Sequence, residues 1–327
     1  MKGKTPVALL TGFLGSGKTT LLSRVLAQGG FADTAVIINE FGEISIDHLV
    51  VADLTENIIE LRDGCLCCTI RGDLVMTLRD LNRRRYLQEI PPFRRVIVET
   101  TGLADPIPLV HTLMTNQPLM TAYRLDAVVC VVDAEHGLTT LASHDTAQDQ
   151  VALADILVVS KVDIAARAAV EALRERVATI NAGAEIVEVA NGEVDAAHVF
   201  GRCLFQPEAR DEALTQWLHC DHVHHDHGAR YGAHEIRHAE PLSLAGTGVF
   251  LNRVVNEMKD NILRIKGIAA FRGKDSRPAV LHAVQNKFYP INWLAGWPDT
   301  DHASRFVFIG RELDTRRIDE LFASLCV

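Results

Sequence analysis

Two patterns of apolar and polar positions alternate along the first two thirds of the chain. Short runs rich in valine, isoleucine and leucine are apolar at nearly every position, which is typical of strands buried in a parallel sheet. Longer segments between them have a helix-like pattern. The predicted strands are residues 7–10, 35–39, 95–99, 127–133, 156–160 and 185–189, and the predicted helices are residues 18–28, 72–85, 106–115 and 165–180.

This alternation predicts the fold class of the first domain. Strand, helix and strand in succession form right-handed crossovers, and a series of crossovers makes an α/β domain. We therefore expect residues 1–205 to form a doubly wound, mostly parallel sheet with flanking helices.

The pattern changes near residue 205 and predicts a second, smaller domain. Residues 206–232 are interpreted as a linker, and residues 233–327 as an α+β domain. Strands are expected at residues 234–243, 262–271, 280–289 and 306–311, and helices at residues 249–261 and 315–325.

The linker is rich in histidine. Neutral imidazoles bind zinc, nickel or cobalt, so such a loop is able to gather metal ions. A solvated linker without a specific role is the alternative. The crowded histidines are His219, His222, His224, His225 and His227.

Composition excludes several classes of protein. The chain has 327 residues, of which 48% are hydrophobic and 23% charged, which excludes wholesale disorder, collagen and coiled coil. The net charge of −9 disfavours nucleic acid and anionic membranes as partners. Seven cysteines, an odd number, suit a reducing compartment. With no signal peptide and no run of transmembrane length, we expect a cytoplasmic protein.

The most specific motif follows the first predicted strand. Residues 12–19 read Gly-Phe-Leu-Gly-Ser-Gly-Lys-Thr and lead into a predicted helix, which is the full pattern of a phosphate-binding loop in its required context. Glycines let backbone N–H groups converge on phosphate oxygens, the lysine supplies a positive charge, and the threonine hydroxyl reaches Mg²⁺. The expected nucleotide-binding residues here are Gly12, Gly15, Ser16, Gly17, Lys18, Thr19 and Thr20.

A second motif lies at the end of the predicted strand 95–99. Glu99 falls at the carboxyl end of the sheet, where it is able to hold Mg²⁺ directly or through water. Gly102 can offer its N–H to the terminal phosphate. Lys18, Thr19 and Glu99 are therefore the candidate catalytic residues.

A third motif predicts the choice of base. Ser160, Lys161 and Asp163 follow a predicted strand, and an aspartate carboxylate accepts hydrogen bonds from the N1 and N2 donors of guanine. Adenine has no such pair of donors, so the motif favours GTP. Many GTP-binding proteins have asparagine where this chain has Ser160, which removes one side-chain donor.

Three thiols within four residues indicate metal or redox chemistry. Cys65, Cys67 and Cys68 have no second paired-cysteine motif elsewhere in the chain, so a closed four-sulfur zinc site is not indicated. An open thiolate site suits transient binding of zinc, cobalt or copper(I), and buried or redox cysteines without metal are the alternative. Glu40 and Glu43, just upstream, either assist Mg²⁺ or the thiolate site or are solvated surface residues.

Together these motifs resemble the CobW family of GTPases, and the second domain resembles that family's C-terminal domain. The resemblance implies a GTP-hydrolysing metallochaperone, related to the accessory GTPases that deliver nickel to urease and hydrogenase, and associated with zinc or cobalt. By position, Cys65, Cys67 and Cys68 match the family's metal motif with Glu43 assisting, and Thr19 and Glu99 match its magnesium-binding positions. The motifs are residues 12–19, 39–43, 64–68, 99–106 and 160–163, with 262–267 and 306–310 in the second domain.

The leading hypothesis is nucleotide-controlled metal delivery. GTP and Mg²⁺ would order the segments that carry Glu40 to Glu43 and Cys65 to Cys68, and hydrolysis would release Zn²⁺ or Co²⁺ to a client metalloprotein. The alternatives are a metal-buffering protein that uses nucleotide only for stability, and an ATP-dependent small-molecule kinase. The expected partners are GTP, a transition metal ion and a client metalloprotein, with no nucleic acid or membrane. The sequence leaves open whether the protein forms a homodimer.

Overall fold

The computed structural model describes residues 3–39, 58–60, 69–201, 230–274 and 277–325. The chain divides into two compact units. The first comprises Met1–Gln150, Ala154–Arg174 and Ile186–Arg202, and the second comprises Val151–Leu153, Glu175–Glu185 and Cys203–Val327. No helix in the described ranges is both long and apolar enough to cross a membrane.

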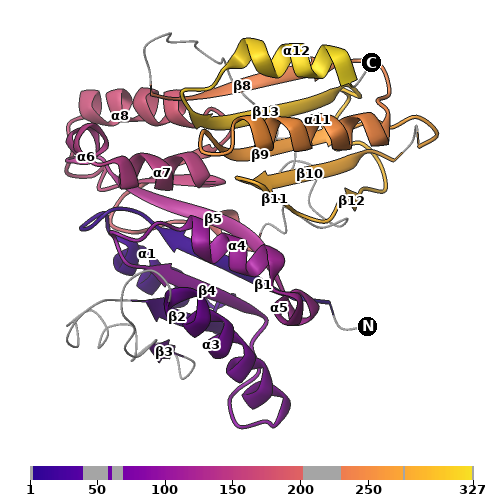
Figure 1. The fold of residues 1–327 in the computed structure, drawn as a ribbon. Coiled ribbons are helices and arrows are strands. Elements are labelled where there is room, and N and C mark those ends of the chain that lie inside the picture. Colours follow the sequence, from indigo (N-terminus) through magenta and orange to yellow (C-terminus); the bar gives the residue numbers. More distant parts are fainter. Residues whose placement is uncertain (1–2, 40–57, 61–68, 202–229, 275–276, 326–327) are drawn as a thin grey trace. The chain divides into compact units, whose positions relative to one another are not determined.

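The first sheet has seven strands in the order β3-β2-β4-β1-β5-β6-β7 (Figure 1). Its central strands are buried at nearly every position, because helices flank the sheet and leave few positions for polar side chains. The registered pairs within it run parallel. The strands are β1 (Thr5–Thr11), β2 (Thr34–Asn39), β3 (Ile58–Glu60), β4 (Arg95–Thr100), β5 (Tyr123–Asp133), β6 (Ile156–Ser160) and β7 (Glu185–Val189).

The flanking helices connect these strands in the order that the sequence pattern predicts. Four of them correspond to the predicted helices, and four others were not predicted. The helices are α1 (Lys18–Leu26), α3 (Thr69–Tyr86), α4 (Ile107–Thr115), α5 (Gln117–Ala122), α6 (Gly137–Ser143), α7 (Asp145–Leu153), α8 (Arg167–Ile180) and α9 (Ala196–Val199). The prediction of a doubly wound α/β fold is confirmed.

Strand register places the candidate loops at one edge of the first sheet. Leu10 of β1 lies opposite Glu99 of β4, and Asp133 of β5 lies opposite Ser160 of β6. Because the strands are parallel, the loops that follow β1, β4, β5 and β6 all leave from the carboxyl edge. The chain also leaves β2 after Asn39 at this edge, opposite Thr100.

The second unit contains an antiparallel sheet in the order β11-β10-β9-β13-β8. This α+β domain is the one predicted after the linker. Two helices, α11 and α12, contribute to its core. The elements are β8 (Tyr231–His238), α11 (Leu244–Glu257), β9 (Ile262–Ala269), β10 (Ala279–Val284), β11 (Lys287–Phe288), β12 (Asn292–Trp293), which pairs with β10, β13 (Ser304–Arg311) and α12 (Thr315–Leu325).

Several predicted boundaries in the second unit were wrong, including the strand expected at residues 234–243, which is β8 (Tyr231–His238) in the structure. Residues 280–289 do not form one strand: the chain turns at Gln285, whose φ is 48°, and returns as β11 to pair with β10. Helix α11 begins at Leu244, five residues earlier than predicted, because the Ser243 side chain accepts a hydrogen bond from the Gly246 N–H (3.2 Å) and caps the helix.

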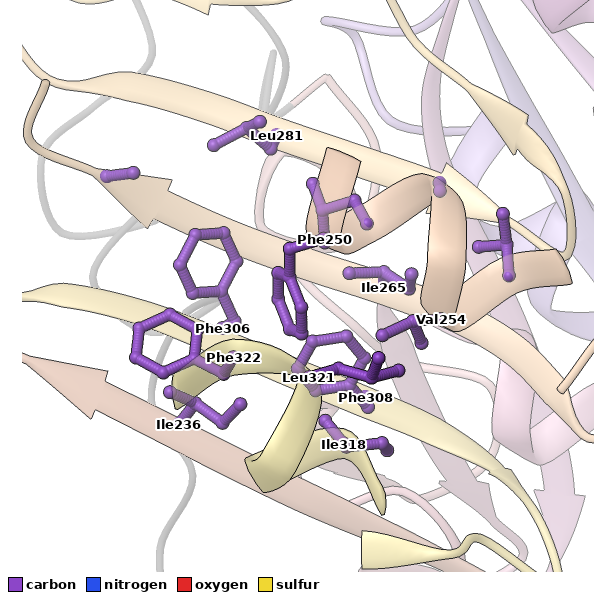
Figure 2. Close-up of a cluster of buried hydrophobic side chains, with 14 of the residues drawn as sticks. Ile236, Phe250, Val254, Ile265, Leu281, Phe306, Phe308, Ile318, Leu321 and Phe322 are labelled. Carbon is purple, nitrogen blue, oxygen red and sulfur yellow. The ribbon is translucent and has the colours of Figure 1, made fainter. Parts of the chain in front are cut away.

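Aromatic rings fill the core of the second unit (Figure 2). Phe250 of α11 is fully buried and meets Phe306, Phe308 and Phe322 edge to face, at centroid separations of 6.4, 5.9 and 5.3 Å. Edge-to-face rings are favoured because the positive edge of one ring meets the negative face of the other. Phe250 therefore joins α11 both to strand β13 and to helix α12.

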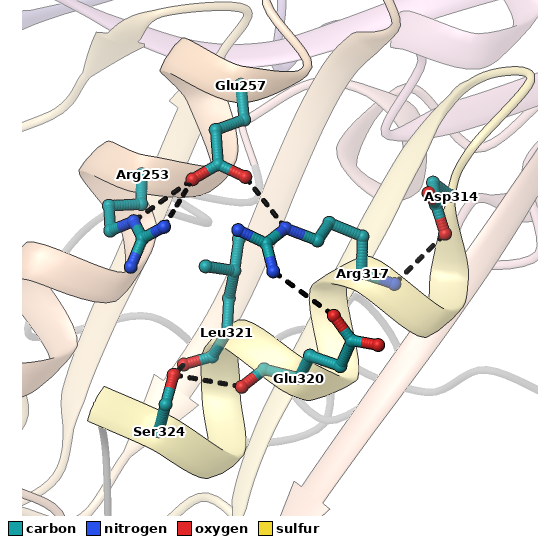
Figure 3. Close-up of polar contacts among 7 residues, drawn as sticks. All are labelled: Arg253, Glu257, Asp314, Arg317, Glu320, Leu321 and Ser324. Atoms are coloured by element: carbon teal, nitrogen blue, oxygen red, sulfur yellow. Dashed lines mark hydrogen bonds and ion pairs between the residues drawn. The ribbon is translucent and has the colours of Figure 1, made fainter.

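A surface network joins the same two helices (Figure 3). Glu257 of α11 accepts hydrogen bonds from Arg317 of α12 (2.8 Å) and from Arg253 of its own helix (2.7 Å). These bonds, the one from Arg317 first, lower the pKa of the Glu257 carboxyl below its ordinary value. Because the groups are exposed, the network aligns the helices rather than supplying most of their stability.

We expect Phe250→Ala to lower the free energy of unfolding of the second unit by about 3–5 kcal/mol, because it removes buried ring surface and leaves a cavity. Chemical denaturation followed by circular dichroism measures the change. Val249→Ala is the matched control: its side chain is 50% exposed on the same helix, and we expect a change within about 0.5 kcal/mol. Equal effects of the two substitutions would contradict the assigned core.

Candidate nucleotide site

The phosphate loop has the backbone that its glycines permit. Gly12 has φ of 139°, and a Cβ there would lie 2.3 Å from the Val131 carbonyl oxygen of β5. Gly17, the residue before helix α1, has φ of 93° in the left-handed region. A side chain is excluded at the first position and strained at the second, so the loop requires glycine at both. The chain consequently turns tightly from β1 into α1.

The loop presents a positive site for an anion. No side chain caps the N-terminus of α1, and its first turn has no acidic residue, so the helix dipole is uncompensated there. Lys18 is buried, and its Nζ donates to the carbonyl oxygens of Gly12 (2.8 Å) and Phe13 (3.2 Å). The buried Ser16 hydroxyl has no hydrogen-bond partner within the described part of the chain. These groups fit a phosphate chain.

Thr19 and Glu99 meet across the first sheet. The Thr19 hydroxyl, in the first turn of α1, donates to Glu99 Oε1 at the end of β4 (2.8 Å), and the Glu99 side chain is buried. A hydroxyl and a carboxylate beside a phosphate site are the hard oxygen ligands that Mg²⁺ prefers. This donor set fits Mg²⁺, with Thr19 and Glu99 as the residues that would hold it. Thr20, the next residue, is exposed.

The segment after β4 passes directly over the phosphate loop. A Cβ on Gly102 would lie 2.5 Å from the backbone nitrogen of Leu14, so only glycine allows this approach. On its other side, Gln150 Nε2 of α7 donates to the carbonyl oxygens of Gly102 (3.2 Å) and Ala104 (3.0 Å). Gln150 therefore holds this segment against the loop.

The loop after β6 is tied to the phosphate loop by a hydroxyl. Ser160 Oγ donates to the Ser16 carbonyl oxygen (2.6 Å), so a serine supplies a tether between the two loops. Lys161, with φ of 60°, forms an ion pair with Asp133 at the end of β5 (2.7 Å). Asp163 is exposed, and its Oδ1 accepts the Asn191 N–H (3.0 Å). The contact with Asn191 holds the carboxylate of this exposed side chain in place.

Several residues at this site were not predicted from the sequence. Asp133 could have been found, because an acid that ends a buried strand is the same signal that identified Glu99. Gln150 lies inside a helix with no local signal. His144 likewise has no local signal, and its ring stacks on Phe13 of the phosphate loop at 4.5 Å. Only the fold brings these side chains to the site.

The candidate metal-binding residues lie outside the described residues. They are Cys65, Cys67, Cys68, Glu40 and Glu43, and the histidines between residues 219 and 227 also lie outside. Helix α3 begins directly after Cys68, and β3 ends at Glu60. Since β3 pairs in parallel with β2, the chain leaves β3 at the carboxyl edge, where Glu99 lies.

Within the described ranges, no group of three or more histidine, cysteine or acidic side chains is arranged to hold a metal ion. Cys130 of β5 is the free cysteine described there, and burial raises the pKa of its thiol to about 12. A thiol with that pKa is protonated at neutral pH, whereas metal ligands are thiolates. Cys130 is therefore a packing residue.

We expect Ser160→Ala to lower the affinity for GTP and GDP by roughly 5- to 100-fold, because it leaves the buried Ser16 carbonyl without its donor. Isothermal titration calorimetry with each nucleotide measures the effect. Ser143→Ala, at an exposed position in α6, is the control and should bind as the unaltered protein does. Unchanged affinity in Ser160→Ala would show that the tether does not support the site.

Comparison with known proteins agrees with this geometry. The chain is 34% identical over 319 residues to the zinc chaperone YjiA of Escherichia coli, covering 98% of both chains. It is 31% identical to the zinc chaperone CobW of Pseudomonas aeruginosa, covering 96% of this chain and 90% of the relative. The crystal structure of Zn(II)-bound YjiA GTPase from E. coli matches with a TM-score of 0.76 at 29% identity, covering 99% of both chains.

Two family models match consecutive parts of the chain. Residues 231–326 match the cobalamin synthesis protein cobW C-terminal domain. Residues 6–188 match the nucleotide-binding domain of CobW, HypB and UreG. Since this second match covers more than half of the chain, the protein belongs to the CobW/HypB/UreG family of P-loop GTPases and carries the CobW C-terminal domain.

Proposed function

We propose that this protein is a GTP-hydrolysing metallochaperone that binds zinc at Cys65, Cys67 and Cys68 and delivers it to a client metalloprotein under nucleotide control. The observation that carries the proposal is the Thr19–Glu99 hydrogen bond beside the phosphate loop, at the same edge from which the chain leaves β2 and β3. Relatives named zinc chaperones over nearly the whole chain support the choice of metal.

Hydrolysis requires that the outer phosphates be held and their charge neutralised. Lys18 and the N-terminus of α1 supply positive charge, and Thr19 and Glu99 supply oxygen ligands for Mg²⁺. Bound Mg²⁺ would neutralise charge that develops between the outer phosphates. Gly102 would offer its N–H from a segment that Gln150 holds over the loop. These residues favour phosphoryl transfer to water.

Guanine preference follows from the loop after β6. Asp163 is fixed by Asn191 and accepts donors that guanine has and adenine lacks. This supports GTP over the ATP of a small-molecule kinase.

Metal control follows from the connectivity around the nucleotide site. The segment with Glu40 and Glu43 begins directly after β2, and the segment with the three cysteines lies between β3 and α3. Contacts to the terminal phosphate can therefore bias both segments, and hydrolysis would remove that bias. Zinc suits a borderline thiolate site, and cobalt is the second candidate.

We expect Lys18→Ala to abolish phosphate release, because it removes the charge that holds the outer phosphates. The unaltered protein should turn over slowly, below about one GTP per minute, as unassisted GTPases do. Malachite-green detection of phosphate measures both, and Lys287→Ala, at an exposed position in the second unit, is the control. Absence of phosphate release from the unaltered protein would favour the metal-buffering alternative.

We expect zinc affinity to differ at least about tenfold between the GTP-bound and GDP-bound protein, because the phosphate biases the cysteine segment. Competition with a chromophoric chelator measures the affinity with a slowly hydrolysed GTP analogue, with GDP and without nucleotide. Replacement of Cys65, Cys67 and Cys68 by serine is the control and should remove the nucleotide-dependent component. Equal zinc affinity in all three states would exclude nucleotide control.

A further inference from the structure

A large groove lies at the amino edge of the first sheet, away from the nucleotide site. Its volume is about 1550 Å³, and it is bounded by the start of β1, the last turns of α3 and the loop that leads into β4. Pockets for small ligands usually measure about 300–1,000 Å³. The groove is therefore more suited to a segment of a macromolecule than to a metabolite.

Positive charge dominates this groove. Its lining includes the cationic residues Lys4, Arg79, Arg83, Arg85 and Arg94, against the single carboxylate of Glu89. The whole chain has a net charge of −9, so this surface has the opposite sign to the protein as a whole. Such a local excess attracts an acidic partner in spite of the overall charge.

Two of the cations already have carboxylate partners. Arg83 forms ion pairs with Asp80 (3.0 Å) and Glu89 (3.4 Å), and Arg94 pairs with Asp33 (2.9 Å). Their charge is largely compensated. The excess in the groove therefore comes from the other three cations.

Arg85 is held in place entirely by neutral groups. Its guanidinium donates to Thr5 Oγ1 (2.9 Å) and Asn82 Oδ1 (2.8 Å), and more weakly to the Phe93 carbonyl oxygen (3.4 Å), and it lies over the Phe93 ring at 4.5 Å. This positive charge is pre-organised and has no carboxylate partner among the residues that the structure describes, and pre-organisation lowers the entropy lost when a ligand binds.

Arg79 and Lys4 add two adaptable cations beside Arg85. Both are exposed, and neither forms an ion pair with a carboxylate within the described ranges. Apolar surface lies next to them: Tyr86 is 86% exposed, and Pro91 and Pro92 are exposed as well. A ligand for this groove thus needs both carboxylates and an apolar side chain.

We propose that this groove binds an acidic segment of a partner protein, with carboxylates on Arg79, Arg85 and Lys4 and an apolar side chain against Tyr86 and the neighbouring prolines. Three cations without a carboxylate partner in the described part of the chain, on a concave surface, suit a short peptide better than a nucleic acid or a flat anionic membrane, which need broader positive surfaces.

The groove and the nucleotide site can be occupied at the same time. Strand β1 is seven residues long and runs from the groove to the phosphate loop. At about 3.3 Å per residue, roughly 20 Å separate the two sites. A segment in the groove therefore leaves the carboxyl edge accessible.

Fluorescence anisotropy of the full chain with a labelled peptide tests the proposal. The probe is a short peptide rich in aspartate and glutamate around one phenylalanine, and its analogue has asparagine and glutamine at the acidic positions. We expect saturable binding of the acidic probe only, weakened by salt because the contacts are charged and exposed.

Charge reversal assigns the binding to the groove. We expect Lys4→Glu with Arg79→Glu to weaken binding of the probe at least about tenfold, and the milder Arg79→Gln to weaken it less. Lys259→Glu with Arg316→Glu makes the same change of charge at two exposed positions of the second unit and should leave binding unchanged within about twofold. Circular dichroism melting checks that every variant is folded, and phosphate release should be unaffected.

Three results would overturn the proposal. The first is no saturable binding of the acidic probe, and the second is equal binding of its amide analogue or of the doubly reversed variant. The third is tighter binding of anionic phosphatidylserine vesicles or of a single-stranded oligonucleotide, lost in the same double variant. That result would assign the groove to a different polyanion.

Discussion

The hydrogen bond between Thr19 and Glu99 is the contact on which the nucleotide site depends. It joins the first turn of α1 to the end of β4, two elements 80 residues apart in sequence. It forms because Leu10 and Glu99 are in register on adjacent parallel strands, so the loop after β1 and the carboxylate that ends β4 reach the same edge. The buried apolar positions of both strands fix that register, since a slip would move every side chain along the sheet.

Close backbone approach gives the site its second constraint. Gly102 lies so close to the backbone of Leu14 that a Cβ would not fit. The Gln150 side chain of α7 donates a hydrogen bond to the Gly102 carbonyl oxygen and holds the same segment. The Ser160 hydroxyl at the end of β6 donates to the Ser16 carbonyl oxygen of the phosphate loop. The phosphate loop therefore contacts the segments after β4 and β6, and neither segment is able to move far without disturbing it. Phosphate-dependent rearrangement needs this kind of dense contact, because packed elements shift between discrete arrangements rather than deform gradually.

Local spacing was sufficient to predict most of the fold and the phosphate loop. Buried strands and the Gly12–Thr19 motif are encoded by neighbouring residues, whose periodicity and glycine positions can be read directly. Gln150 and His144 could not be predicted in this way, because their roles come from contacts across the fold. The turn at Gln285 was missed because its residue with positive φ is a glutamine, which is not a typical residue for that conformation, although Asn286 follows it. Fold prediction therefore succeeded where the signal was local.

Helix α3 connects the segment that carries the three cysteines to the groove at the amino edge of the first sheet. It begins immediately after Cys68 and, 18 residues later, ends at Tyr86 in the wall of the basic groove. At about 1.5 Å per residue, helix α3 is roughly 27 Å long, and its backbone hydrogen bonds make it stiff along that length. A partner bound in the proposed groove would therefore contact the C-terminal end of the helix whose N-terminal end directly follows the three cysteines. One continuous helix would then couple binding in the groove to the proposed metal site.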